Sequence, residues 1–152
     1  MNIESVWDYP RPPRLEPAGA RIRIVHNGRT LAETTEARRI LETSHPPVYY
    51  LPPSAVDTCQ LHRSPTRQSF CEFKGLATYW SLADTPDVAW SYESPSPRYA
   101  ALAHHLAFYA TKVDECWVDD ERVIPQPGDF YGGWITSNLR GPFKGAPGTR
   151  GW

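Results

Sequence analysis

The clearest alternation of hydrophobic and polar positions lies early in the chain. Over residues 21–26, Ile22 and Ile24 alternate with charged residues, which is the period of a half-buried β-strand. Asn27-Gly28 follows directly, and the next apolar residues stand at 31–32. Asn-Gly favours a two-residue turn with positive φ at both positions, so the pattern predicts a β-hairpin.

Further apolar and aromatic runs are short and are separated by Pro, Gly or charged residues, which is typical of strands joined by tight turns. Strands are expected at 48–51, 68–74, 76–82, 88–92 and 106–109, and a second hairpin at 115–118 and 122–124. Candidate segments for short helices are 35–41, 54–61 and the residues from Pro97 onward. The pattern predicts a mainly β protein with one or two short helices.

Proline and aromatic residues reinforce this prediction. The 152 residues include 16 Pro and 10 Gly, and 6 Trp, 8 Tyr and 5 Phe stand against a single Met. A chain of this length predicts one domain. Residues 1–20 hold four prolines and are expected to be an extended lead-in packed on the body. Residues 21–124 form the β domain, and residues 125–152 are a Gly- and Pro-rich tail that wraps the same domain.

Charge and hydropathy exclude several classes of protein. Lys and Arg total 16 against 17 Asp and Glu, and a net charge of −1 argues against nucleic-acid binding. No apolar run is long enough for a membrane span, and the N-terminus lacks the apolar core of a secretory signal. Cys59, Cys71 and Cys116 are odd in number and far apart, which predicts reduced thiols in a cytoplasmic protein. The oligomeric state stays open.

Several spaced blocks carry a resemblance to a known family. They are LETSHPPVYY at 41–50, FCEFKG at 70–75, AWSY at 89–92, AFY at 107–109, GGWIT at 132–136 and the opening ESVWDYPRP at 4–12. These blocks resemble the family called domain of unknown function 427, and the opening resembles its actinobacterial branch. The resemblance implies a β-tent-like fold of antiparallel sheets, similar to Mss4-like proteins and to the thalidomide-binding domain of cereblon. It implies no reaction, and the chain lacks the Gly-Ser pair with spaced Asp residues typical of nucleotidyltransferases.

The cysteine spacing bears on metal binding. β-tent relatives often hold zinc between two Cys-x-x-Cys pairs, because tetrahedral zinc needs four nitrogen or sulfur ligands. Cys59, Cys71 and Cys116 stand alone here, so we expect no structural zinc and no cofactor. A mixed site built from His45, Cys71 and a second histidine stays open.

Cys71 and Lys74 are the first candidates for chemistry. The thiolate is the nucleophilic form of cysteine, and a nearby Lys or His cation favours it. On a continuous strand, residues three apart face opposite sides, so the two share a pocket only if a bulge intervenes. The structural alternative is a buried thiol with a solvent-facing lysine, or an ion pair of Lys74 with Glu42 or Glu72.

Glu42 and His45 are the second pair, in a corner stiffened by Pro46-Pro47. Histidine titrates near neutral pH and a nearby carboxylate raises its pKa, which suits acid–base catalysis. The structural alternative is that Ser44 and His45 satisfy backbone groups in the turn. A structural role is also expected for His104-His105, because adjacent residues of a strand point to opposite faces.

Aromatic side chains are the third candidate group. Most aromatic residues of a small β domain belong to its core. A cage of several rings can nevertheless recognise a flat or cationic small molecule. We therefore expect Tyr50, Trp80, Trp90 and Tyr92 to bind substrate. The resemblance to the cereblon-type domain, which holds its ligand in a tryptophan cage, points the same way.

These candidates lead to three hypotheses of function. The first is a small-molecule enzyme of unknown reaction, with Glu42, His45, Cys71 and Lys74 as catalytic residues. The second is a binding or sensor module that uses the same aromatic pocket without chemistry. The third is an interaction domain whose exposed aromatic tail docks a partner protein. Converging polar groups with perturbed pKa values favour the enzyme, whereas an aromatic cage with only backbone donors favours the binding module.

Overall fold

Short β-strands make up most of the structure, a computed structural model that describes residues 2–128 and 130–152. The strands are β1 (Glu4–Ser5), β2 (Arg14–Pro17), β3 (Ile22–His26), β4 (Arg29–Thr34), β5 (Arg38–Leu41), β6 (Val48–Tyr50), β7 (His62–Cys71), β8 (Gly75–Leu82), β9 (Thr85–Tyr92), β10 (Ala107–Phe108), β11 (Glu115–Val118), β12 (Glu121–Arg122), β13 (Ile124–Pro125), β14 (Trp134–Ile135) and β15 (Leu139–Arg140). The 3₁₀ helices are η1 (Val6–Asp8), η2 (Pro53–Ala55), η3 (Thr58–Gln60) and η4 (Pro97–Leu102). The chain is a single small domain, mainly β with few short helices, as the pattern predicts.

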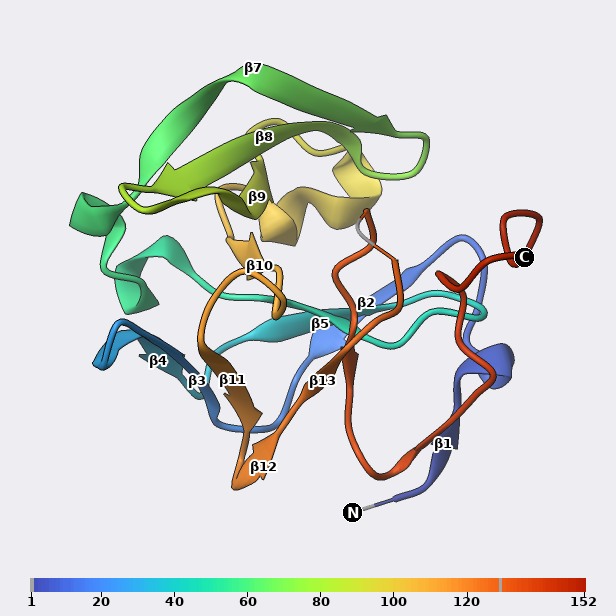
Figure 1. The fold of residues 1–152 in the computed structure, drawn as a ribbon. Coiled ribbons are helices and arrows are strands. Elements are labelled where there is room, and N and C mark those ends of the chain that lie inside the picture. Colours follow the sequence, from blue (N-terminus) through green and yellow to red (C-terminus); the bar gives the residue numbers. More distant parts are fainter. Residues whose placement is uncertain (1, 129) are drawn as a thin grey trace.

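Antiparallel sheets form the framework. Their strand orders are β10-β9-β8-β7, β12-β11-β3-β4 and β2-β5-β6. In Figure 1 the sheet that contains β7, β8 and β9 forms the top of the molecule, β3, β4 and β11 lie at the lower left, and β2 and β5 lie in the centre below the top sheet. The strand β1 pairs in parallel with β15, so the two ends of the chain are joined.

The first predicted hairpin is present. Asn27 and Gly28 adopt φ values of 52° and 73°, and His26 pairs with Arg29 on either side of them. Both turn residues therefore have the positive φ that Asn and Gly tolerate best. The local chemistry of two residues is enough to fix this turn.

The helix expected at 35–41 is wrong, because residues 38–41 form the strand β5. This strand lies in the middle of its sheet, with β2 on one side and β6 on the other. Backbone partners on both edges outweigh the helical propensity of the segment. The helix expected at 54–61 is also wrong in extent: the segment holds the separate turns η2 and η3.

The sheet of β8 and β9 separates two hydrophobic clusters. The first cluster packs on β3 and β11 and includes Ile22, Ile24 and Phe108. The second packs on β5 and β6 and includes Tyr50, Tyr79, Trp90, Tyr92 and Tyr109. The second cluster is therefore rich in aromatic rings that carry polar groups, whereas the first is more aliphatic.

The tail lies along the N-terminal segment. The rings of Trp7 and Trp152 meet edge to face with centroids 5.3 Å apart, and a guanidinium nitrogen of Arg11 donates to the carbonyl of Trp152 (3.2 Å). Figure 1 shows the C-terminus on the same side of the molecule as β1 and η1. No helix in the described part of the chain has the length and apolarity to cross a membrane.

Candidate functional site

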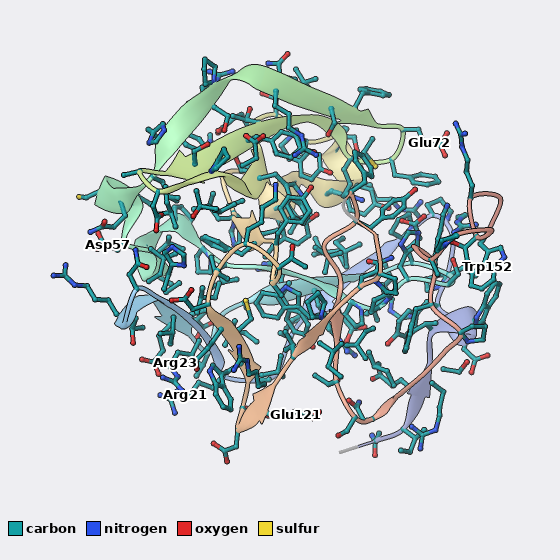
Figure 2. All side chains as sticks on the ribbon, in the orientation of Figure 1. Arg21, Arg23, Asp57, Glu72, Glu121 and Trp152 are labelled. Atoms are coloured by element: carbon teal, nitrogen blue, oxygen red, sulfur yellow. The ribbon has the colours of Figure 1, made fainter. Side chains whose placement is uncertain are left out.

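A cavity of about 450 Å³ opens between the β7–β8 turn, strands β5 and β6, and the C-terminal tail. Aromatic rings and several charged groups line its walls. It brings together the predicted site residues Glu42, His45, Tyr50, Cys71, Lys74, Trp90 and Tyr92. Glu72 and Trp152 also line the cavity, and Figure 2 shows both on the same side of the molecule.

Trp80 is the predicted site residue that the cavity does not include. The register pairs Tyr79 with Trp90 and Trp80 with Ala89. Tyr79 and Trp90 belong to the aromatic cluster, whereas Trp80 packs against the first cluster and its Nε1 donates to Ser91 Oγ (2.9 Å). This corrects the placement expected from the sequence, because neighbouring residues of a strand point to opposite faces.

The turn between β7 and β8 places Lys74 beside Cys71. The sequence pattern predicts a strand over 68–74, in which the two side chains would point to opposite faces. Instead β7 ends at Cys71, which pairs with Gly75, and residues 72–74 form the turn. Gly75 has a φ of 113°, a value that glycine adopts far more readily than other residues. The tight turn therefore places Lys74 next to Cys71, which a continuous strand would do only with a bulge.

Lys74 is a buried cation. Its side chain and backbone are only 7% exposed, and its Nζ lies 5.9 Å from the centre of the Tyr92 ring. Burial by itself lowers the pKa of Lys74, but Tyr50, Cys71 and Glu42 outweigh it, so the net pKa is raised. The Lys74 side chain is therefore a charged ammonium at neutral pH, next to the Cys71 thiol.

Tyr50 and Tyr92 present neutral hydroxyl groups to this ammonium. Burial raises the pKa of both phenols well above the ordinary value. The ring centroids lie 6.3 Å apart, and the two hydroxyl groups interact with each other. A protonated phenol hydroxyl can donate a hydrogen bond to a ligand oxygen and stay neutral.

Trp90 forms the central aromatic wall. Its ring stands nearly perpendicular to Tyr50, with centroids 6.3 Å apart at 87°, and lies 4.7 Å from Tyr109. A Cβ on Gly132 would meet the far edge of the Trp90 ring at 2.3 Å. The absence of a side chain at Gly132 thus lets the tail backbone lie directly against the indole.

Gln126 determines the tautomer of His45. Its Oε1 accepts from the backbone N–H of Gly133 (3.0 Å), and its Nε2 donates to the carbonyl of Lys144 (2.8 Å). A backbone N–H only donates and a carbonyl only accepts, so the amide has one possible orientation. Its remaining N–H donates to His45 Nδ1 (3.1 Å), and the imidazole proton must therefore lie on Nε2.

The direction of the His45 shift is opposite to the one expected. Burial lowers the pKa of His45 to about 3, and the positive charges of Lys144, Arg11 and Lys74 act in the same direction. The carboxylate of Glu42 is near, with Oε2 3.8 Å from His45 Nε2, but the same oxygen lies 3.4 Å from Arg11 Nε. His45 is therefore a neutral hydrogen-bond donor and not a base poised near neutral pH.

Several lining residues were not predicted from the sequence. They are Arg11, Tyr79, Gln126, Tyr131 and Lys144. The Tyr131 ring contacts the His45 ring at 4.8 Å and lies 5.3 Å from Lys144 Nζ. The one local signal in the tail is a polar amide held between two prolines, at 125–127. Such a residue has a restricted backbone and so a well-defined side-chain direction.

The three cysteines lie in different surroundings. Cys59 is exposed, Cys71 is partly exposed and Cys116 is buried in the first cluster, where burial raises its pKa to about 12. Within residues 2–128 and 130–152, no three His, Cys, Asp or Glu side chains gather as ligands of one ion.

Fold and cavity together define a small β-rich domain with an aromatic-lined pocket that its own tail helps to wall. The chain belongs to the family described as domain of unknown function DUF427, which matches residues 14–119. That stretch contains Glu42, His45, Cys71 and Lys74, whereas Gln126 and the rest of the tail follow it. No curated protein matches the chain.

Proposed function

We propose that this protein is an enzyme that acts on a small molecule, with the thiol of Cys71 as its nucleophile. The observation that carries the proposal is the position of this thiol in an aromatic cavity, beside the buried ammonium of Lys74. A cation next to a partly exposed cysteine favours the thiolate, which is the reactive form. A cavity of about 450 Å³ is in the range that holds small organic ligands.

The proposed chemistry is attack on a carbonyl-type carbon of the substrate. A lone pair of the thiolate forms the sulfur–carbon bond, and the electron pair of the carbon–oxygen π bond moves onto the oxygen. The ammonium of Lys74 and the neutral hydroxyls of Tyr50 and Tyr92 lie on the same wall as the thiol. Donors and positive charge arranged where an oxyanion develops lower the barrier of such a step.

His45 has a different role from the one expected of a triad base. Its Nδ1 accepts from Gln126, and its Nε2 carries the proton. Neither nitrogen is free to take a proton, so His45 cannot act as the base for Cys71. His45 instead offers a fixed N–H donor to the substrate, and Glu42 with Arg11 forms a neutral ion pair beside it.

The proposal is tested by alkylation of Cys71 with iodoacetamide, in a protein with Cys59→Ser and Cys116→Ser. We expect a rate at pH 7 above that of glutathione, and a rate about tenfold lower after Lys74→Gln, because the thiolate loses its neighbouring cation. Lys112→Gln is the matched control, since Lys112 does not line the cavity. A Cys71 rate no higher than that of glutathione and unchanged by Lys74→Gln would refute the nucleophile.

A non-catalytic binding or sensor module is the second candidate. The neutral, immobilised imidazole of His45 favours it, because a fixed donor serves recognition as well as catalysis. The same cavity would then hold its ligand reversibly. An unreactive Cys71 together with saturable binding of a small aromatic molecule would select this function over the enzyme.

A further inference from the structure

Among the described residues, one cation at the His45 end of the cavity has no carboxylate partner. Of the cations that surround His45, Arg11 is paired with Glu42 at 3.4 Å, and Lys74 faces the thiol of Cys71. The third cation is Lys144, which is partly buried. Its Nζ lies over the ring of Tyr131, 5.3 Å from the centroid.

Lys144 has no counter-ion in the described part of the chain. No ion pair of Lys144 occurs there, and its tight contacts are made by its backbone. The N–H of Lys144 donates to the carbonyl of Ser44 (2.9 Å), and its carbonyl accepts from Gln126 (2.8 Å). The fold thus fixes the backbone of Lys144 next to His45 and leaves its ammonium directed at an aromatic wall of the cavity.

Arg39, another partly buried cation of this protein, has carboxylate partners. The guanidinium of Arg39 forms two hydrogen bonds to Glu4 (3.2 and 2.9 Å) and a further ion pair with Glu16 (3.2 Å). A cation withdrawn from water needs such partners, because its desolvation is costly. Arg39 has its carboxylates within the chain, whereas no residue in the described part of the chain supplies one to Lys144, so a ligand is free to do so.

We propose that the ligand of this cavity carries a carboxylate or phosphate group, which binds between the ammonium of Lys144 and the Nε2–H of His45, and a flat unsaturated body that packs on Trp90. The proposal deepens the small-molecule site proposed above and rests on it. Charge-assisted hydrogen bonds from an ammonium and an imidazole N–H suit either anion. The rings of Trp90 and Tyr109 offer the apolar surface that a flat body needs.

The test is equilibrium binding of matched probes, measured by titration calorimetry at low salt. Phenylacetate and phenylacetamide have nearly the same shape and differ in charge. We expect phenylacetate to bind at least about tenfold more tightly, because a hydrogen bond to a charged group contributes at least that factor. Phenyl phosphate in a parallel titration shows which of the two anions the site prefers.

Lys144→Gln should reduce the preference for phenylacetate over phenylacetamide to about twofold or less, with binding of phenylacetamide unchanged. The substitution keeps the backbone hydrogen bonds of Lys144, so the variant should fold. Arg23→Gln is the control, because it also removes one positive charge. Figure 2 shows Arg23 far from Glu72 and Trp152, which line the cavity. The control should keep the full preference.

Equal affinities for the charged and neutral probes, or no binding of any probe, would overturn the anion site. So would a preference that survives Lys144→Gln. Binding does not require a reactive thiol, so these outcomes are independent of the alkylation of Cys71. An inert Cys71 with intact preference for phenylacetate refutes the enzyme and leaves the anion site standing.

Discussion

The side-chain amide of Gln126 donates a hydrogen bond to Nδ1 of His45, with 3.1 Å between the two nitrogens. Two backbone groups, the N–H of Gly133 and the carbonyl of Lys144, dictate which end of the amide faces the imidazole. Protonation of Nδ1 would place two N–H groups against each other. This contact, from the tail to the loop before β6, therefore fixes the Nε2–H tautomer of His45 and acts together with burial to keep the ring neutral.

The first prediction concerns stability against pH. The pKa of His45 is about 3 in the folded protein and near 6.5 in the unfolded chain. Below pH 6.5 the unfolded state binds a proton that the folded state does not, so the free energy of unfolding falls as the pH falls towards 3, by up to about 1.4 kcal/mol per pH unit. Well above pH 6.5 the residue is neutral in both states and contributes no pH dependence. Urea denaturation at pH 7, 6.5 and 5 measures the effect.

His45→Gln supplies the comparison, because glutamine does not titrate. Wild type should lose about 1–2 kcal/mol more than this variant between pH 6.5 and 5. The difference between the two proteins removes the contribution of carboxylates, which titrate in both. Parallel curves for wild type and variant would show that His45 takes up a proton in the folded state as readily as in the unfolded one.

Local turn chemistry could be predicted from the sequence, and non-local strand pairing could not. Asn27-Gly28 fixes its hairpin through its own backbone preferences. Residues 35–41 have no such local determinant, and the strand there exists because β2 and β6 supply hydrogen bonds on both sides. Helix propensity is a weak guide wherever distant strands decide the outcome.

In the candidate site, too, features set by local sequence could be predicted and features set by strand register could not. The sequence placed Cys71 and Lys74 together only on condition of a bulge, and a three-residue turn meets that condition. It grouped Trp80 with Trp90, because the register of β8 against β9 is not readable from either strand alone. Gln126 was not predicted, since the Gly- and Pro-rich tail has no periodicity from which its path could be inferred.

The second prediction uses Trp80 and Trp90 as a matched pair. Trp90 lines the cavity and Trp80 lies on the other face of the same sheet. Trp90→Phe should weaken binding of phenylacetate several-fold, because the flat body of the probe loses part of its aromatic surface. Trp80→Phe should leave the affinity unchanged, although it also removes an indole. Calorimetric titration of both variants decides the matter, and equal losses would mean that the probe does not bind against Trp90.

The third prediction concerns the ion pairs of Arg39. Its guanidinium neutralises two carboxylates, Glu4 and Glu16, and it lowers the pKa of Glu4 despite the opposing effect of burial. Arg39→Met should destabilise the protein by about 1–2 kcal/mol, since it leaves two partly buried carboxylates without a partner and solvent screens part of the loss. Arg38→Met is the control, because Arg38 forms no ion pair within residues 2–128 and 130–152, and it should cost less than about 0.5 kcal/mol. Chemical denaturation measures both, and similar values for the two variants would assign no net stabilisation to the network.

The last prediction concerns the approach of the tail to Trp90. A Cβ at position 132 would lie 2.3 and 2.7 Å from two carbons of the Trp90 ring, closer than any real contact. Gly132→Ala must therefore move either the indole or the tail, and overpacking of a buried site costs about 1–3 kcal/mol. The same displacement alters the wall on which the probe packs, so affinity for phenylacetate should fall together with the free energy of unfolding. Gly151→Ala is the control for stability, because a Cβ there meets no atom within 4 Å, and it should leave the free energy of unfolding unchanged. A Gly132→Ala protein with wild-type stability and affinity would show that the tail does not hold the Trp90 ring in place.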